Sequence, residues 1–316
     1  METDERIKKI SVIIPTRNRL KDVAACLNSI SKQTKLPDEV IIVDSSKTQE
    51  LKNKIKNFNN LNIKYVYNTI CNSASFQKNL GAKESTGDIL FFSDDDTIWT
   101  PNYLREMLST FDKYPDCVAV TGSPILRKKT FIKKILNFLM NTFCFFFFLS
   151  IIGNGKFRIT GFPKIFSIKV NEIKKCEFIY GFGMAFRREI FEEFEFDKHM
   201  VGYCWGDDDD IAYRISRKYS IYYNPFAKIL HNKTKSERED DYLTQKKTVE
   251  YYHYLFKKNI PQDCIHELAF WWSLIGMFIL TLLKGTMKKN LTGVKGFFAG
   301  LKNILKQNNS KIKNEN

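Results

Sequence analysis

Residues 89–96 read ILFFSDDD, an apolar run that ends in three adjacent carboxylates. A short, continuous apolar run of this kind predicts a buried β-strand. A second acidic group, GDDDD at residues 206–210, follows more than a hundred residues later in a chain whose formal net charge is +15. Adjacent carboxylates repel one another unless a cation or a raised pKa relieves the repulsion. Together the two groups indicate a metal, a phosphorylated ligand and a catalytic base, and therefore an enzyme.

Similar apolar runs precede this one and alternate with helical patterns. Strands are predicted at 10–14, 40–43 and 63–67, and helices at 20–33, 48–58 and 73–85. Strands that are apolar throughout and alternate with helices predict a mostly parallel sheet covered on both faces. In such α/β sheets, ligands bind beyond the carboxyl ends of the strands. Arg17, Asp44 and the triplet from Asp94 to Asp96 all lie at such ends, so we expect a ligand site there.

The composition is that of a globular protein in a reducing compartment. The chain has 316 residues, of which 43% are hydrophobic and 27% charged, enough for one large domain or one domain with an appendage. Its seven cysteines form no CxxC pair, which argues against a zinc ribbon or a disulfide framework. The first residues, METDERIKKI, contain no apolar signal-peptide core, so we do not expect secretion.

Two uncharged stretches stand out in the second half of the chain, at 135–152 and 268–283. The second holds 16 residues, about 24 Å of helix, which is short of a hydrocarbon core of about 30 Å. Its paired tryptophans and flanking lysine favour a helix that lies on or dips into a membrane, over a buried core helix or a full span. Residues 261–316 hold eight lysines against three acids, which favours a membrane surface over nucleic acid as the anionic partner. Asn137 and Asn141 interrupt the first stretch, whose membrane contact stays open.

A set of motifs within residues 10–232 resembles family 2 glycosyltransferases of the GT-A fold. The motifs are SVIIPTRNR at 11–19, VDSS at 43–46, QKNLG at 77–81, TGDILFFSDDD at 86–96, YGFGMAFRR at 180–188, WGDDDDIAYR at 205–214 and NPFAKILHN at 224–232. Each motif alone is weak, whereas the ordered set is specific. The resemblance implies an α/β, Rossmann-like fold with a mostly parallel sheet flanked by helices. We expect a nucleotide-sugar-binding half at 1–125, an acceptor-side half at 126–260 that includes the insert 135–152, and a membrane-associating helix with a basic tail at 261–316.

The resemblance implies a metal site at the end of the fourth strand. Asp96 is expected to bind Mg²⁺ or Mn²⁺, Asp94 to contact the metal or the donor ribose, and His231 to reach the metal or the diphosphate. Such hard cations prefer carboxylate oxygens and stabilise the charge that develops on a departing diphosphate. Three consecutive aspartates blur the register, so Asp95 could share either role. The alternatives are a loop cluster that caps the helix near Pro101, and a structural histidine.

The resemblance also implies a set of donor-binding residues. They are Pro15, Thr16 and Arg17 in the loop that wraps the nucleotide, Asp44 at the position that holds the nucleobase or ribose, Lys78 and Asn79 near the donor, and Asp94 and Asp95. Ordinary turn chemistry after a strand is the alternative for the first loop. A solvated helix charge is the alternative for Lys78.

An inverting transfer needs one base that takes the proton of the acceptor hydroxyl as this group attacks the anomeric carbon. By resemblance Asp208 is expected to be that base, with Asp207 as the alternate. Asp209 is expected only to benefit from the dipole of a helix that starts there, and Arg214 to pair with Asp210.

The acceptor is expected to contact Gly183 and Trp205. Gly183 lies in the segment 181–186, whose glycines let the backbone approach a sugar closely. Trp205 could be a platform on which a sugar stacks, and packing in the core is the equal alternative.

These expectations combine into one function. We expect transfer of a sugar from a nucleotide-sugar donor to a saccharide acceptor, lipid-linked, in surface glycan assembly at the cytoplasmic face of the cell membrane. No glutamine here begins the Gln-x-x-Arg-Trp segment typical of processive relatives, which favours single additions. A non-catalytic nucleotide-sugar or glycan-binding module of the same fold is the alternative. A nucleic-acid partner is not expected, because the predicted cleft is acidic.

Overall fold

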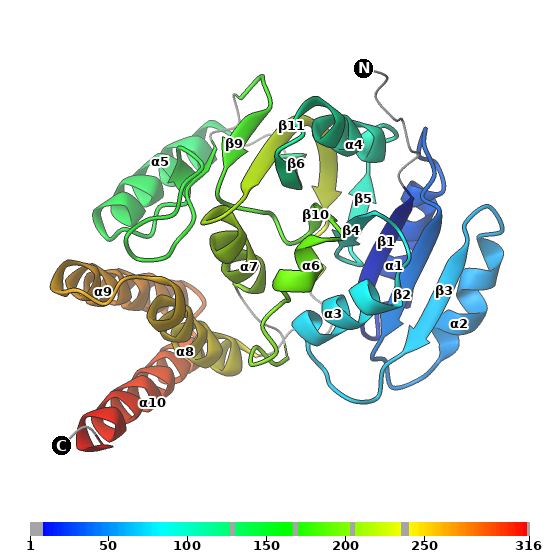
Figure 1. The fold of residues 1–316 in the computed structure, drawn as a ribbon. Helices are drawn as coiled ribbons and strands as arrows, with labels where there is room; N and C mark the ends of the chain where they lie inside the picture. The colour runs from blue at the N-terminus through cyan, green and yellow to red at the C-terminus, as the bar shows by residue number, and fades with distance from the viewer. Residues whose placement is uncertain (1–8, 127–129, 167–169, 203–205, 235–239, 315–316) are drawn as a thin grey trace.

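Four parallel strands form the first half of a nine-stranded sheet (Figure 1). The computed structural model describes residues 9–126, 130–166, 170–202, 206–234 and 240–314. The strands are β1 (Ile10–Thr16), β2 (Glu39–Asp44), β3 (Ile63–Tyr67) and β4 (Ile89–Ser93), in the spatial order β3-β2-β1-β4. All four coincide with predicted strands. Because β4 ends at Ser93, the acidic triplet begins where the strand stops.

The second half of the sheet is mixed. β10 (Gly183–Arg187) runs antiparallel between β4 and β6 (Cys117–Pro124). β11 (Ser220–His231) is parallel to β6, whereas β5 (Thr97–Trp99) and β9 (Lys174–Cys176) are antiparallel to β11. The short strands β7 (Ile152–Gly153) and β8 (Ile165–Phe166) pair separately. Since β10 enters the sheet at the edge where β4 ends, its first residue pairs with Ser93 and the segment before it lies beside the triplet.

Helices cover both faces of the sheet, as the uniformly apolar strands predict. One face carries α1 (Leu20–Ile30), α2 (Glu50–Lys54) and α4 (Tyr103–Lys113), and the other carries α3 (Ala74–Glu84), α6 (Ile190–Glu193) and α7 (Asp207–Ser216). Along β1, Val12 and Ile14 face the first layer and Ile13 the second, so both cores are built from alternate residues of the same strands. The helix predicted at 48–58 is split into α2 and a 3-10 turn, Ile55–Asn57.

Three helices after the sheet form an appendage, at the lower left of Figure 1. They are α8 (Asp241–Asn259), α9 (Cys264–Met287) and α10 (Thr292–Asn314), and they share a separate apolar core with Phe162. Among the described residues, α9 is the one helix long and apolar enough to cross a membrane, and 44% of its apolar window is buried. It starts earlier than the predicted 268–283 because the Asp263 carboxylate caps it, accepting the amides of Ile265 and His266.

The helix α5 (Phe131–Phe146) overlaps the predicted insert 135–152, and the residues at its end contact α9. The Trp272 indole stacks on the Phe147 ring at 4.9 Å and donates a hydrogen bond to the Phe146 carbonyl at 2.9 Å. A Cβ at Gly276 would lie 2.3 Å from the Phe147 Cβ, so only glycine permits this approach. The exposed apolar side chains on these two helices include Phe131, Ile132, Leu136, Phe138, Leu139, Phe145, Ile265, Leu268, Ile275 and Leu283.

Candidate active site

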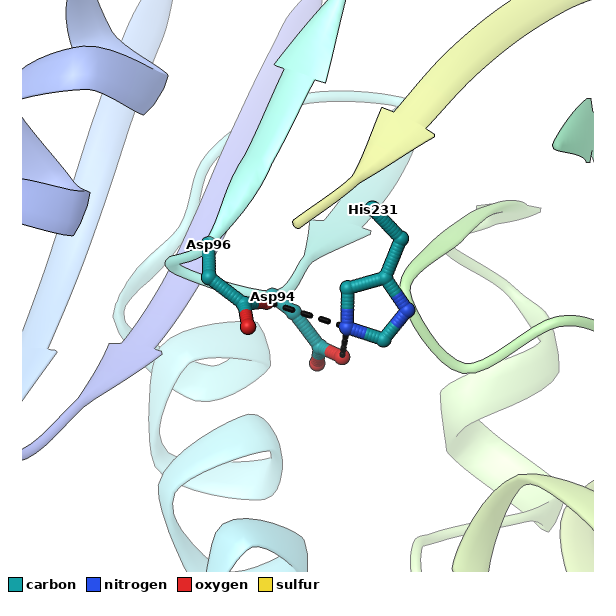
Figure 2. Close-up of side chains that lie close together, drawn as sticks. All are labelled: Asp94, Asp96 and His231. Atoms are coloured by element: carbon teal, nitrogen blue, oxygen red, sulfur yellow. Dashed lines mark ion pairs between the residues drawn. The ribbon is translucent and has the colours of Figure 1, made fainter. Parts of the chain in front are cut away.

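Asp94, Asp96 and His231 converge beyond the carboxyl end of β4 (Figure 2). His231 Nε2 lies 3.1 Å from Asp96 Oδ1 and 3.8 Å from Asp94 Oδ2. The pairing of β5 with β11 sets His231 opposite Thr97, the residue after the triplet. One ligand atom from each side chain lies within 4.8 Å of the others. The fold therefore brings together the three residues that the resemblance assigns to the metal.

This cluster fits a divalent cation. Asp96 Oδ1 is buried and, among the described residues, receives no hydrogen bond of good geometry. Two carboxylates and an imidazole suit Mn²⁺, and the carboxylates suit Mg²⁺. Burial on its own would raise the pKa of Asp96, but His231, the Thr234 amide and Arg19 outweigh burial, so this pKa lies below its ordinary value. The Asp96 carboxylate thus stays ionised, as a metal ligand must.

Asp95 has other partners than its two neighbours. It accepts a hydrogen bond from Thr16 Oγ1 at 2.7 Å and pairs with the Arg19 guanidinium at 2.9 Å. Burial raises the pKa of Asp95 to about 7, although Arg19 opposes the rise. The triplet therefore divides into Asp94 and Asp96, which meet His231, and Asp95, which is held by the loop after β1. The helix-capping alternative is wrong, because β5 separates the triplet from α4, whose N-cap is Asn102.

A pocket of about 180 Å³ opens beside the triplet. Its lining comprises Pro15, Thr16, Arg17, Arg19, Asn72, Ala74, Gln77, Asp94, Asp95 and Gly202. The pocket thus collects the whole predicted nucleotide loop. The Gln77 amide holds this loop in place, because it donates to the carbonyls of Thr16 at 3.0 Å and Val43 at 2.7 Å, which ties the ends of β1 and β2 together.

Arg19 and Gln77 were not among the predicted site residues, although both occur in the quoted motifs. Arg19 reaches Asp95 from 76 positions away, and Gln77 reaches Thr16 from 61. Such long-range contacts leave no mark on local sequence patterning, so only the motif as a whole could have pointed to them.

Three predicted donor residues, Asp44, Lys78 and Asn79, are engaged inside the protein and are not part of the pocket lining. Asp44 is fully buried and accepts hydrogen bonds from the Tyr65 hydroxyl and the Ser46 amide, each at 2.8 Å. Asn79 clamps the backbone of Phe196, donating to its carbonyl at 2.8 Å and accepting from its amide at 2.9 Å. The side chains of Asp44 and Asn79 hold loops around the site, and their contact with a donor stays a prediction.

Lys78 links the two acidic groups. Its side chain is buried, its Nζ lies 2.6 Å from Asp207 Oδ2, and it sits over the Phe196 ring at 5.0 Å. Burial on its own would lower the pKa of Lys78, but the charges of Asp207, Asp94 and Asp208 outweigh burial and raise it. The alternative of a solvated helix charge is therefore wrong, and the ammonium stands within electrostatic reach of both groups.

Asp208 is the carboxylate of the second group best prepared to accept a proton. It follows Gly206, whose φ of 99° lies in the left-handed region that favours glycine and turns the chain into α7. Asp208 Oδ2 accepts the Gly181 amide at 2.8 Å. Burial, and then the charge of Asp207, raise the pKa of Asp208 to about 6, against the opposing charge of Lys78. A base with a pKa near the operating pH combines ionisation with proton affinity.

The surroundings of Asp209 and Asp210 differ from those of Asp208. Asp210 is fully buried and pairs with Arg214 at 2.7 Å, as predicted, and with Lys258 of α8 at 2.9 Å. The pair with Lys258 joins α7 to the appendage. Burial raises the pKa of Asp209 well above its ordinary value, and the charges of its aspartate neighbours add to the rise.

Of the two predicted acceptor residues, the structure describes Gly183. Gly183 begins β10 and is buried, and a Cβ there would lie 2.6 Å from the Tyr103 hydroxyl, so packing requires this glycine. Trp205 lies outside the described residues. The segment just before Gly183 borders the site more closely, since the Phe182 ring lies 4.9 Å from His231 and stacks on Tyr180 at 5.0 Å. Acceptor contact by this segment remains a prediction.

The comparison with known sequences agrees with this geometry. Residues 11–194 match the model of the family described as glycosyl transferase family 2. The uncharacterized glycosyltransferase YwdF of Bacillus subtilis is 37% identical over 100 residues, 31% of this chain and 37% of its own length. The Escherichia coli enzyme named UDP-Glc:alpha-D-GlcNAc-diphosphoundecaprenol beta-1,3-glucosyltransferase WfgD is 28% identical over 100 residues, 32% of this chain and 40% of its own length. The matches thus span less than half of these relatives.

Solved structures share the fold over most of the chain. The mannosyltransferase PcManGT of Pyrobaculum calidifontis, solved with GDP-Man and Mn²⁺, superposes with a TM-score of 0.56 at 15% identity, covering 93% of this chain and 86% of that one. TarS 1–349 of S. aureus, solved with UDP-GlcNAc, gives a TM-score of 0.57 at 15% identity, covering 93% and 79%. The fold is GT-A. Since the family model covers more than half of the sequence, the chain belongs to glycosyl transferase family 2.

Proposed function

We propose that the chain transfers a sugar from a nucleotide-diphosphate sugar to a hydroxyl group of an acceptor saccharide, with inversion at the anomeric carbon. The observation that carries the proposal is that a cluster able to bind a metal and a carboxylate able to accept a proton lie close enough to interact electrostatically. One is the cluster of Asp94, Asp96 and His231, and the other is Asp208 with its raised pKa, on which Asp94 acts directly. Lys78 is the cation to which both respond.

In this mechanism Asp208 takes the proton of the acceptor hydroxyl while the hydroxyl oxygen attacks the anomeric carbon. The bond from that carbon to the diphosphate oxygen breaks, and the nucleoside diphosphate leaves with the electron pair. A divalent cation on Asp94, Asp96 and His231 would stabilise the negative charge that develops on the leaving diphosphate. The pocket residues Thr16 and Arg17 orient the nucleotide. The Gly181 amide, by donating to Asp208, aims the base.

The donor is proposed to be a UDP- or GDP-sugar and the cation Mn²⁺ or Mg²⁺. The structural relatives were solved with GDP-Man and Mn²⁺ or with UDP-GlcNAc, which supports both choices. The acceptor is proposed to be lipid-linked, as the diphosphoundecaprenol in the name of WfgD states for that enzyme. The reaction is proposed to belong to the assembly of a surface glycan. The exposed apolar side chains of α5 and α9 support a position on the cytoplasmic face of a membrane.

The test is a panel of nucleotide sugars, measured by thermal shift and by release of nucleoside diphosphate, with and without Mn²⁺. At a hundred times its dissociation constant, a true donor should raise the melting temperature by roughly 5 °C. The shift should need the cation and be absent in Asp96→Asn, and Asp241→Asn, a surface change on α8, serves as the control. A shift without transfer or hydrolysis, even with membranes that supply acceptor, would favour a non-catalytic binding module. No shift with any donor would overturn the donor site.

A further inference from the structure

A second cavity, of about 710 Å³, lies between α5 and the strands β6 and β11. Its lining comprises Ser123, Pro124, Ile125, Leu126, Asn137, Asn141, Ile151, Ile152, Ile165, Phe166, Tyr180, Tyr223 and Lys228. The volume falls within the range of roughly 300–1,000 Å³ that is typical of sites for small molecules. Most of the wall is aliphatic or aromatic, and a few polar groups converge on it. This combination is typical of a site that binds an amphiphile.

The cavity adjoins the catalytic side of the sheet through Tyr180. The next residue, Gly181, donates its amide to Asp208, and the Tyr180 ring stacks on Phe182, which in turn lies against His231. The cavity wall at Tyr180 is therefore connected both to the proposed base, through Gly181, and to the metal cluster, through Phe182. In the part of the chain that the structure describes, no residue lines both this cavity and the nucleotide pocket.

Lys228 is the charged side chain of this lining. Its Nζ donates to Ser123 Oγ at 3.1 Å, and no carboxylate of the described residues lies within ion-pair distance of it. Burial lowers the pKa of Lys228. An ammonium held in an apolar wall without a counter-charge favours an anionic ligand, since the ligand supplies the missing charge.

The helix α5 gives the cavity an inner polar edge and an outer apolar face. Asn137 and Asn141, one turn apart, line the cavity and explain why two amides interrupt an otherwise apolar stretch. Leu136 and Leu139 point outward and are 59% and 58% exposed. The chain thus offers apolar surface outside the helix and an apolar cavity inside it.

We propose that this cavity binds the lipid-phosphate part of the acceptor, with the apolar chain along α5 and the phosphate on Lys228. This inference rests on the proposed function, because it assigns a site to the lipid that the acceptor carries. The occupant is an apolar chain that ends in a phosphate. The aliphatic wall selects the chain, and the uncompensated ammonium selects the phosphate over a neutral alcohol.

Calorimetric titration of the full chain with farnesyl phosphate tests the proposal without requiring turnover. Farnesol and inorganic phosphate are titrated as the two halves of the ligand. We expect farnesyl phosphate to bind best and Lys228→Met to weaken it about tenfold, because one charge-assisted hydrogen bond is lost. The weaker binding of farnesol should be unchanged in Lys228→Met. The backbone carbonyl that Lys228 offers to Thr100 is kept in this variant.

A cavity-filling variant supplies the steric test. Asn141→Trp should abolish binding of both farnesyl compounds, whereas Leu139→Trp, on the outer face of α5, should leave binding within twofold. Circular dichroism and a thermal melt recorded without any ligand verify that each variant is folded. Equal binding in all three variants, or loss in Leu139→Trp alone, would place the ligand on the outer surface and overturn the proposal.

The outcomes also separate this inference from the proposed function. If a nucleotide sugar and Mn²⁺ stabilise the protein but farnesyl phosphate fails to bind, the cavity assignment is wrong and the donor site stands. If farnesyl phosphate binds through Lys228 while no donor does, the lipid site stands and the proposed transfer reaction fails.

Discussion

The acidic group after β4 and the acidic group at the start of α7 are both runs of consecutive aspartates, but different cations neutralise them. In the first group Arg19 neutralises Asp95, and Asp94 and Asp96 are left facing a histidine. In the second group Lys78 pairs with Asp207, and Arg214 and Lys258 pair with Asp210. Asp208 receives only hydrogen bonds from amides. Asp95, Asp207 and Asp210 each have a lysine or arginine at hydrogen-bond distance and hold the fold. Asp94, Asp96 and Asp208 have none at that distance among the described residues, and they are the carboxylates that we assign to the chemistry.

Among substitutions in the two acidic groups, Asp208→Asn should have the largest effect. The amide keeps the shape of the side chain but cannot accept the acceptor proton, so the transfer rate should fall about a thousandfold. Binding of the nucleotide sugar, measured by thermal shift, should survive. Asp209→Asn is the matched control one position along α7. A rate within tenfold of the wild type in Asp208→Asn would refute its role as the base.

Asp210→Ala should lower the stability of the folded protein, whereas Asp208→Asn should lower the transfer rate. Removing this fully buried carboxylate takes a partner from both cations, which leaves Arg214 with the Glu195 carbonyl and Lys258 with Asp197. Since both cations are partly exposed, we expect the free energy of unfolding to fall by about 3 kcal/mol, the lower end for a broken buried pair. Urea unfolding measures the loss. Asp241→Ala, which breaks an exposed pair with Lys288, should change it by less than about 1 kcal/mol. Similar losses in both variants would contradict this account of Asp210.

The pH dependence of kcat/KM should report the pKa of Asp208 in the free enzyme. Because burial and Asp207 raise this pKa to about 6, half of the base is protonated at that pH. Activity should therefore fall about tenfold for each pH unit below 6 and level off above about 7. Steady-state rates between pH 4.5 and 8 provide the profile. A profile flat from pH 5 upward would mean that another group takes the proton.

Asp209→Asn should have the smallest effect, and one of opposite sign. Burial raises the folded-state pKa of Asp209, so ionising it costs stability, and this cost grows as the pH rises above the unfolded-state pKa. The neutral amide removes the cost, and we expect a gain within about 1 kcal/mol that is larger at pH 8 than at pH 5. Melting curves at the two pH values measure it. A loss of stability at pH 8 would show that the Asp209 carboxylate has a partner in solution.

Local sequence patterns were enough to predict the parallel strands and the helices that cover them. The four parallel strands, the helices that cover them and the position of the triplet follow from apolar runs of short length. The antiparallel direction of β10 was not predictable in this way, because an apolar strand reads the same in either direction. That direction matters for the site, since it brings residues 180–182 beside Asp94.

The roles of single side chains depend on partners far away in the sequence. Lys78 meets Asp207 across 129 positions, and this contact changes it from an ordinary helix charge into the link between the two acidic groups. Arg19 divides the triplet by taking Asp95, which three identical adjacent residues could not reveal. The order of the motifs predicted which segments contribute to the site, and the tertiary contacts show which side chains of these segments lie together.

The contact between Phe147 and Gly276 has a mechanical consequence. Because position 276 has no side chain, Phe147 at the end of α5 packs directly on the backbone of α9. The Trp272 ring stacks on Phe147 and adds to this contact. Because α5 is one wall of the larger cavity, a change in the position of α9 would reach that wall through this contact. A side chain at position 276 would collide with Phe147, so this glycine is required for the contact that joins the appendage to the α5 wall of that cavity.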